Sequence, residues 1–143
     1  MTENTGVRHG GAPADRGRTT VADVVVEKIA GMAARDVSGV HALGSGFARS
    51  VGSMRERMPG AGSGKSVTRG VSVEVGELQA AIDLEIVVDY GVSITDVAGE
   101  VRENVISAVE RMAGREVVEV NITVSDVKLP DEEDEGEERQ RIQ

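Results

Sequence analysis

Two segments of the chain place apolar residues at the spacing of an amphipathic helix. The first runs from about residue 20 to Asp36, and we expect Thr19 or Thr20 to cap its N-terminus. Its apolar stripe consists of Val21, Val24, Val25, Ile29 and Met32. The second helix is expected to begin after Ser93, which opens an S-x-x-[DE] pattern, and to end at Gly114. Its stripe consists of Val97, Val101, Val105, Ala108 and Met112, with Ile94 and Val109 beside it.

Strands are predicted where apolar and polar residues alternate. Residues 71–75 and the run up to Tyr90 alternate around a short Gly76-Glu77 turn, which predicts a β-hairpin. A shorter strand is expected at residues 39–43. The last strand is expected at residues 117–127, with Val118, Val120, Ile122 and Val124 facing the core.

This element order predicts an α+β fold. One apolar sheet face needs a cover, and two amphipathic helices supply it. We therefore expect a two-layer sandwich with a three- to four-stranded mixed sheet and both helices packed on one face. The second helix is expected to act as a crossover, which would make the last strand pairing parallel and right-handed.

The distribution of charge and glycine divides the chain into a domain and two tails. Residues 1–18 are polar and Gly-rich, and residues 131–143 carry seven acidic residues against two arginines. Neither end can bury a core, so both are expected to be disordered. The domain is expected to span residues 19–130, with a flexible insertion at residues 44–70 that contains seven glycines and five serines.

The composition excludes several classes of function. The chain has no cysteine, which excludes disulfides and thiolate metal sites. The net charge of −9 and an aromatic content of 1% oppose nucleic-acid binding. No signal peptide and no apolar stretch of about 20 residues is present, so we expect a cytoplasmic protein.

The motifs that suggest chemistry lack the residues it needs. GAGSGKS at residues 60–66 resembles a phosphate-binding loop, but Pro59 occupies the position of its first glycine. His9 and His41 have no acidic or histidine residue at ligand spacing, so no metal site is expected. No nucleophile is paired with a base. We expect no enzyme, no cofactor and no small-molecule substrate.

The insertion is the most informative local feature for partner binding. It has five basic residues against Glu56 alone, a local net charge of +4 in an acidic chain. Its apolar residues fall on one face of a short helix, and the candidate partner-binding residues are Phe47, Val51, Met54, Arg55, Arg57 and Met58. This segment either contacts a partner, another copy of the chain or anionic lipid, or folds back onto its own domain.

The runs IVVDYGVSITDVA and VVEVNITV, with the helix ending ERMAG between them, resemble the alkaline shock protein (Gls-type) envelope stress response family of Gram-positive bacteria. The resemblance covers most of residues 20–128. It implies a non-enzymatic scaffold or adaptor in cell-envelope homeostasis, which associates with itself and with a small membrane-anchored partner. Attachment to the inner face of the cell membrane would then be peripheral. Gly- and Arg-rich usage suggests an actinobacterial source.

Two alternatives stay open at this point. A small α+β sheet can bind nucleic acid, although this needs a basic face with surface aromatic residues. A small enzyme would need titratable groups, distant in sequence, to converge in one pocket.

Overall fold

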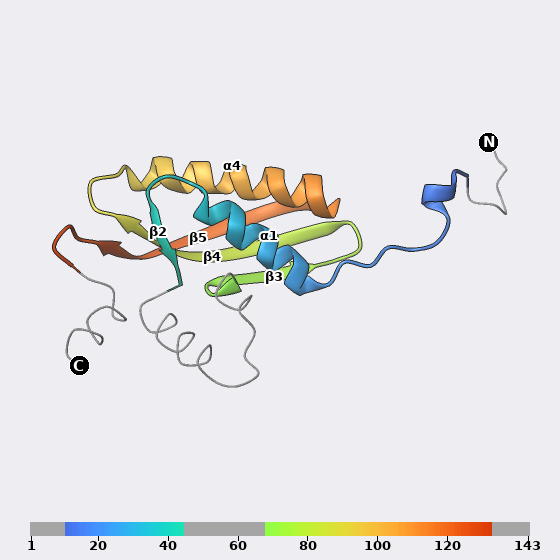
Figure 1. Cartoon of the computed structure of the whole chain (residues 1–143), viewed down its shortest axis with the longest axis horizontal. Coiled ribbons are helices and arrows are strands. Elements are labelled where there is room, and N and C mark those ends of the chain that lie inside the picture. Colours follow the sequence, from blue (N-terminus) through green and yellow to red (C-terminus); the bar gives the residue numbers. More distant parts are fainter. Residues whose placement is uncertain (1–10, 45–67, 133–143) are drawn as a thin grey trace, which may run out of the picture.

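The computed structural model describes residues 11–44 and 68–132. Its elements follow the predicted order and confirm the α+β fold (Figure 1). They are the 3-10 turn η1 (Pro13–Asp15), helix α1 (Asp23–Arg35), strands β2 (Val40–Leu43), β3 (Val71–Val75) and β4 (Gln79–Asp89), helix α4 (Ile94–Ala113) and strand β5 (Glu116–Lys128).

Strand β4 is the centre of the sheet. Strand β5 pairs with it in parallel along its whole length, from Gln79 opposite Glu116 to Asp89 opposite Lys128. On the other side of β4, β3 and then β2 pair antiparallel with successive parts of the same strand. The sheet is therefore mixed, as predicted, and α4 makes the crossover between the parallel strands β4 and β5.

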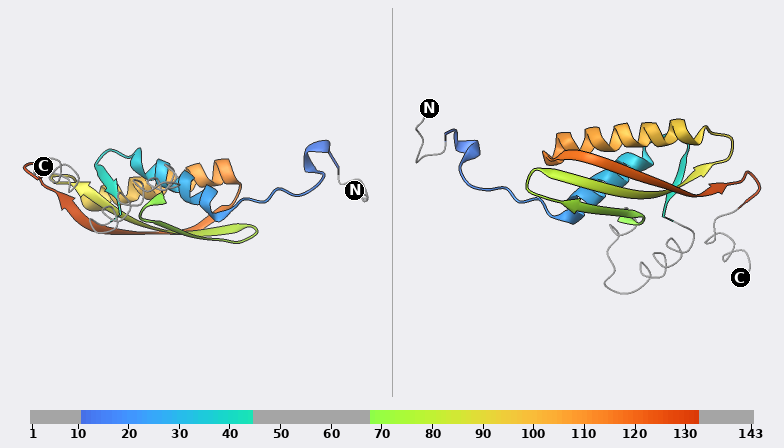
Figure 2. Two further views of the ribbon diagram at one scale, coloured as in Figure 1. Left: turned by 60° about the horizontal axis from the view of Figure 1, so that its bottom comes forward. Right: turned by 180° about the vertical axis from the view of Figure 1, so that it is seen from behind.

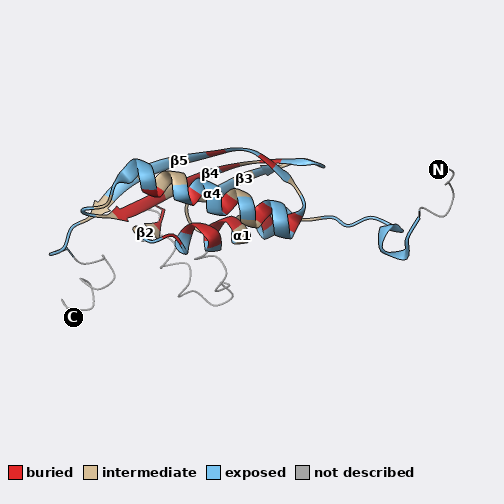
Figure 3. Cartoon of the chain, turned by 90° about the horizontal axis from the view of Figure 1, so that it is seen from above, coloured by how far each residue is buried: buried red, intermediate tan, exposed pale blue. Residues whose placement is uncertain are grey.

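Both helices pack on one face of this sheet, and the core lies between the two layers (Figure 3). Strand β4 contributes the central row of that core: Ile82, Leu84, Ile86 and Val88, none more than 3% exposed. The intervening residues of β4 point to the opposite face. The alternation in the sequence therefore records which side of the sheet is dry as far as Ile86, whereas Val87, which follows on the opposite face, is buried as well.

The buried face of α1 differs from the predicted stripe. Val24, Val25 and Met32 are 43–52% exposed, and the helix instead buries Val26, Ala30, Gly31, Ala33 and Ala34. Most side chains on this face are small and let α1 approach the sheet and α4 closely. Of the predicted stripe, Val21 and Ile29 are partly buried against the core, and the other three residues lie outside. The predicted threonine cap is also wrong, because the N-cap is Ala22, which has no side-chain oxygen.

The second helix follows its prediction more closely. Val97, Val101 and Val105 are buried as expected, whereas Met112 is 62% exposed and its place in the core is taken by Val109 and Ala113. Ser93 is the N-cap residue but makes no side-chain capping hydrogen bond. Gly114 ends the helix with a φ of 68°, in the left-handed conformation that glycine adopts without strain.

One side chain of β5 points the other way from its prediction. Val118 is 53% exposed, whereas Val117 is buried. The cause is a shift in the register between Ala80 and Ala81, where β5 carries one extra residue. An alternating pattern cannot reveal such a bulge, because the residues before and after it keep their own alternation.

Two glycines join β2 and β3 into one interrupted edge. Gly44 donates its N–H to Glu85 O at 2.6 Å, and Gly70 O accepts from Glu85 N–H at 2.9 Å. Both glycines have positive φ, 84° and 80°. A Cβ on Gly70 would lie 2.4 Å from Gly44 N, so the residues are in direct backbone contact and only glycine fits.

The predicted insertion leaves and rejoins the domain around this junction, and most of it, like most of both predicted tails, lies outside the described residues. The disorder predicted there stays a prediction. Among the described helices, none combines the length and hydrophobicity that crossing a bilayer requires.

Gly70→Ala should lower the free energy of unfolding by about 2 kcal/mol or more, because it strains the backbone and forces the two glycines apart. Gly99→Ala is the matched control. Gly99 lies inside α4, where an added Cβ would have no neighbouring atom within 4 Å, so alanine should add roughly 0.5–1 kcal/mol. Urea denaturation of both variants measures the difference. Equal midpoints would contradict the contact between the glycines.

Candidate interaction surfaces

The face of the sheet opposite the helices is open and acidic. The right-hand view of Figure 2 looks onto this face, and both described helices lie behind it. Seven outward side chains on this face come from three strands: Ser72 and Glu74 from β3, Asp83 and Glu85 from β4, and Glu119, Asn121 and Thr123 from β5. Four of these seven are carboxylates and none is basic. A solvated face with one sign of charge attracts a partner of the opposite charge.

The register places these side chains in rows across the sheet. Ala81 lies between Glu74 and Glu119 in one row, so a short methyl side chain separates two longer carboxylate side chains. In the next row, Asn121 lies beside Asp83. The face is therefore acidic, with the small apolar side chain of Ala81 between two of its carboxylates.

Asn121 holds two of these carboxylates in place. Its Nδ2 donates to Asp83 Oδ1 and to Glu119 Oε2, each at 3.0 Å. An amide donor between two like charges satisfies both and offsets part of their repulsion. The sequence marked Asn121 only as an outward residue of the last strand.

The backbone hydrogen bonds determine which groups of β5 point to the outer edge of the sheet. Glu85 directs both its N–H and its C=O toward Gly70 and Gly44 on the β2–β3 side. The direction of the backbone N–H and C=O groups alternates along a strand, so those of the residues next to Glu85 point toward β5. In the parallel register, the backbone groups of Asn121 then point toward β4. The backbone N–H and C=O of Val120 therefore point away from β4, at the free edge, while its side chain is buried in the core.

Side chains of α4 occupy this free edge. Arg102 Nε donates to Val120 O at 3.1 Å, and Glu110 Oε2 accepts the Val117 N–H at 3.0 Å. Helix α4 runs alongside β5 (Figure 1). Unpaired groups on an edge strand are a template for strand addition, and these contacts block that template over the first half of β5.

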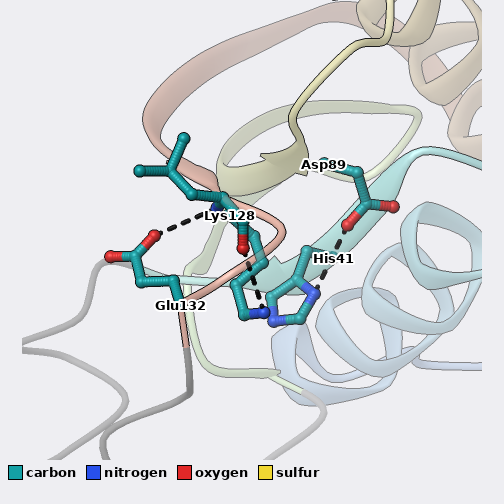
Figure 4. Close-up of polar contacts among 5 residues, drawn as sticks. His41, Asp89, Lys128 and Glu132 are labelled. Atoms are coloured by element: carbon teal, nitrogen blue, oxygen red, sulfur yellow. Dashed lines mark hydrogen bonds and ion pairs between the residues drawn. The ribbon is translucent and has the colours of Figure 1, made fainter.

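A polar cluster lies near the ends of β4 and β5 (Figure 4). His41 Nδ1 lies 3.5 Å from Asp89 Oδ1, and Glu132 Oε1 accepts the Leu129 N–H at 3.0 Å. The sequence has no acidic residue at ligand spacing from His41, but the fold brings one beside it. The antiparallel pairing of Val40 with Val88 brings Asp89 beside His41 from 48 positions along the chain. The spacing of residues along the sequence does not predict this contact between His41 and Asp89.

The candidate partner-binding residues of the insertion, Phe47 to Met58, lie outside the described residues, so their role stays a prediction. Within residues 11–44 and 68–132, no group of three or more acidic or histidine side chains is placed to hold a metal ion.

Residues 11–129 match the model of the Asp23 family, described as having a cell envelope-related function. Here Asp23 is a protein name and not residue 23. The chain belongs to the Asp23 family. The family resemblance inferred from the sequence is thus confirmed, and so is its link to the cell envelope.

Related proteins agree with membership of the Asp23 family. The chain is 34% identical over 117 residues to the "Stress response regulator gls24 homolog" of Streptococcus pyogenes serotype M3, and equally to that of serotype M1. These alignments cover 82% of the chain but 62% of the relatives, so the chain spans less than two thirds of their length.

A further relative covers more of its own length. The protein YqhY of Bacillus subtilis (strain 168) is 34% identical over 113 residues, which is 79% of this chain and 78% of YqhY. These relatives are streptococcal and from Bacillus, and the actinobacterial source inferred from composition stays a prediction. No solved structure matches the chain.

Asn121→Asp should destabilise the fold by about 1 kcal/mol, because it replaces a shared donor with a third carboxylate. Asn121→Ala loses the same two hydrogen bonds without adding a charge. The difference in stability between the two variants therefore measures the repulsion between the new carboxylate and its neighbours. Chemical denaturation in 0.05 and 0.5 M NaCl checks this. Salt should narrow the gap between the two variants, and a gap that does not depend on salt would contradict repulsion as the cause.

Removing both edge contacts, by Arg102→Ala with Glu110→Ala, should raise aggregation through β5 because its backbone groups become accessible. The matched control is Glu100→Ala with Arg111→Ala, which changes the same charges at exposed positions of α4. Thioflavin binding during incubation measures the effect. If both double variants aggregate alike, the contacts do not protect the edge.

Proposed function

We propose that this chain is a non-enzymatic scaffold or adaptor in cell-envelope homeostasis and stress response. It acts by associating with itself and by binding a membrane-associated partner protein. Membership of the Asp23 family and the stress-response name of the streptococcal relatives support the cellular role. The open acidic face supports the mode of action, since it is a broad surface with no cover among the described residues.

The charge of the chain suggests how copies associate. The open face carries Glu74, Asp83, Glu85 and Glu119, whereas the insertion carries an excess of four positive charges. We propose that the basic segment of one copy, with Arg55 and Arg57, lies against the acidic face of the next. Phe47, Val51, Met54 and Met58 would supply the apolar part of the contact. Opposite charges of this kind direct both encounter and specificity.

The same face disfavours the nucleic-acid alternative. Small α+β domains that bind RNA do so on an open sheet face with aromatic and basic side chains. Here that face carries four carboxylates, which repel phosphates, and the single tyrosine, Tyr90, lies beyond the end of β4. A protein partner with a basic surface fits these charges, and the protein would act in the cytoplasm, peripherally at the inner membrane face.

A charge exchange tests the proposed contact. Arg55→Glu with Arg57→Glu should weaken self-association by about tenfold or more, because like charges then oppose each other across the interface. Glu74→Lys with Glu119→Lys should do the same, and the combination of all four changes should restore association. Sedimentation velocity across a concentration range of about 100-fold measures it, with a chain of residues 19–130 beside the wild type to test the tails.

Glu100→Lys with Glu103→Lys serves as the matched control, since it makes an equal change of charge on the exposed side of α4. Unaltered sedimentation of both charge-reversed variants would refute the contact. If the wild type stays monomeric over the whole range, self-association is not intrinsic, and capture of a membrane-anchored protein becomes the remaining test of the scaffold role.

A further inference from the structure

Exposed apolar side chains gather at one end of the sheet. Leu78, Met112 and Val118 are 76%, 62% and 53% exposed, and they come from the β3–β4 turn, the last turn of α4 and the start of β5. Glu116 N–H donates to Leu78 O at 2.8 Å, which joins the turn to the start of β5. The turn and the C-terminal end of α4 lie at the same end of the domain (Figure 1 and Figure 2). We call Leu78, Met112 and Val118 the apolar end.

The fold does not account for a leucine at position 78. Gly76 N–H donates to Gln79 O at 2.7 Å and closes a two-residue loop made of Glu77 and Leu78. Loops of this length favour glycine, asparagine and aspartate, whose backbones adopt the required conformations most easily. Leucine brings no such benefit to the turn, and a side chain this exposed contributes little to the core.

Met112 and Val118 are also outside the core. The sequence pattern predicted both as core residues, but Ala113 and Val117 are buried in their place. The helix end and the bulge therefore turn two large apolar side chains to the surface, near Leu78. Single exposed apolar residues are common on a protein surface, whereas several at one place indicate an interaction site.

The charged residues around the apolar end have both signs. Arg111 and Arg115 are basic, and Glu77, Glu110 and Glu116 are acidic. The carboxylate of Glu110 already accepts a backbone N–H of β5, which leaves two side chains of each sign. A two-fold axis places each residue opposite a different residue of the other copy, so a surface with both signs can pair its own charges. The open acidic face cannot do this, because two such faces repel each other.

We propose that the apolar end binds the apolar end of a second copy of the chain in a two-fold symmetric dimer. Leu78 and Met112 of each copy pack against those of the other, and Arg111 pairs with Glu77 across the contact. The surfaces differ from the acidic face and the basic insertion, so this contact does not depend on the proposed function. Three apolar side chains from each copy make a small contact, typical of a dimer that dissociates on dilution.

Sedimentation velocity tests the dimer in the full chain with the two arginine-to-glutamate changes of the insertion, which remove the other proposed contact. We expect a monomer–dimer equilibrium in this background. Leu78→Ser with Met112→Ser should weaken the dimer by about tenfold or more, because the apolar contact is lost. The matched control is Val24→Ser with Met32→Ser, which changes side chains of α1 that are 47% and 52% exposed. A background variant that is monomeric up to millimolar concentration, or equal weakening by both pairs of changes, would overturn the proposal.

A charge exchange tests the pairing across the dimer. Arg111→Glu should weaken the dimer, because it places like charges opposite each other, and Glu77→Arg in the same chain should restore it. Circular dichroism checks that these surface variants are folded. A double variant as weak as Arg111→Glu alone contradicts the pairing.

Single-cysteine cross-linking in the same background separates a two-fold contact from a head-to-tail contact. In the two-fold dimer position 78 of one copy meets position 78 of the other, so Leu78→Cys alone should be linked into dimers by a short bis-maleimide. Leu129→Cys, at the opposite end of the sheet, is the control and should not be linked. A cross-link that forms only when the two variants are mixed indicates a head-to-tail contact and overturns the two-fold dimer.

Discussion

The domain depends on β4, because this one strand hydrogen-bonds to all the other strands and its side chains separate a dry face from a wet one. Ile82, Leu84 and Ile86 are buried against the helix layer, whereas Asp83 lies in solvent between them in sequence. The partners on either side follow the same alternation. Both the open face and the outer edge are placed by their position relative to this strand.

In this arrangement the edge of the sheet is partly blocked, whereas its face is open. The outer edge of β5 is occupied in part by Arg102 and Glu110 from α4, which limits strand addition. The face is open and carries four carboxylates. A protein that associates through a charged, solvated face can assemble and dissociate with salt and concentration, whereas edge pairing tends toward irreversible aggregation.

The sequence predicted the parts of the fold that depend on local periodicity. The hairpin, the second helix with its Gly114 end and the parallel last strand all follow from patterns within a few residues of one another. The parts that failed depend on packing between elements. Helix α1 turns Val26 and its alanines toward the core, whereas Val24 and Val25 are exposed, and a bulge turns Val118 outward. Neither the buried face of α1 nor the bulge can be predicted from apolar residues that recur with a period of 2 or 3.6.

The candidate sites show the same limit more strongly. The carboxylates of the open face were predicted to point outward, but their rows across three strands, and the position of Asn121 between two of them, required the register. The ion pair of His41 with Asp89 joins residues 48 positions apart. Long-range convergence of this kind cannot be read from spacing along a single sequence.

The central claim is that the open sheet face is buried when copies associate, and thiol accessibility tests it directly. The chain has no cysteine, so Thr123→Cys on the open face and Ser107→Cys on the exposed side of α4 each provide a single reporter. The rate of maleimide labelling is measured across a wide range of protein concentration. We expect the rate at position 123 to fall as concentration rises, while the rate at position 107 stays constant. An unchanged rate at position 123 under conditions where the protein associates would contradict the claim.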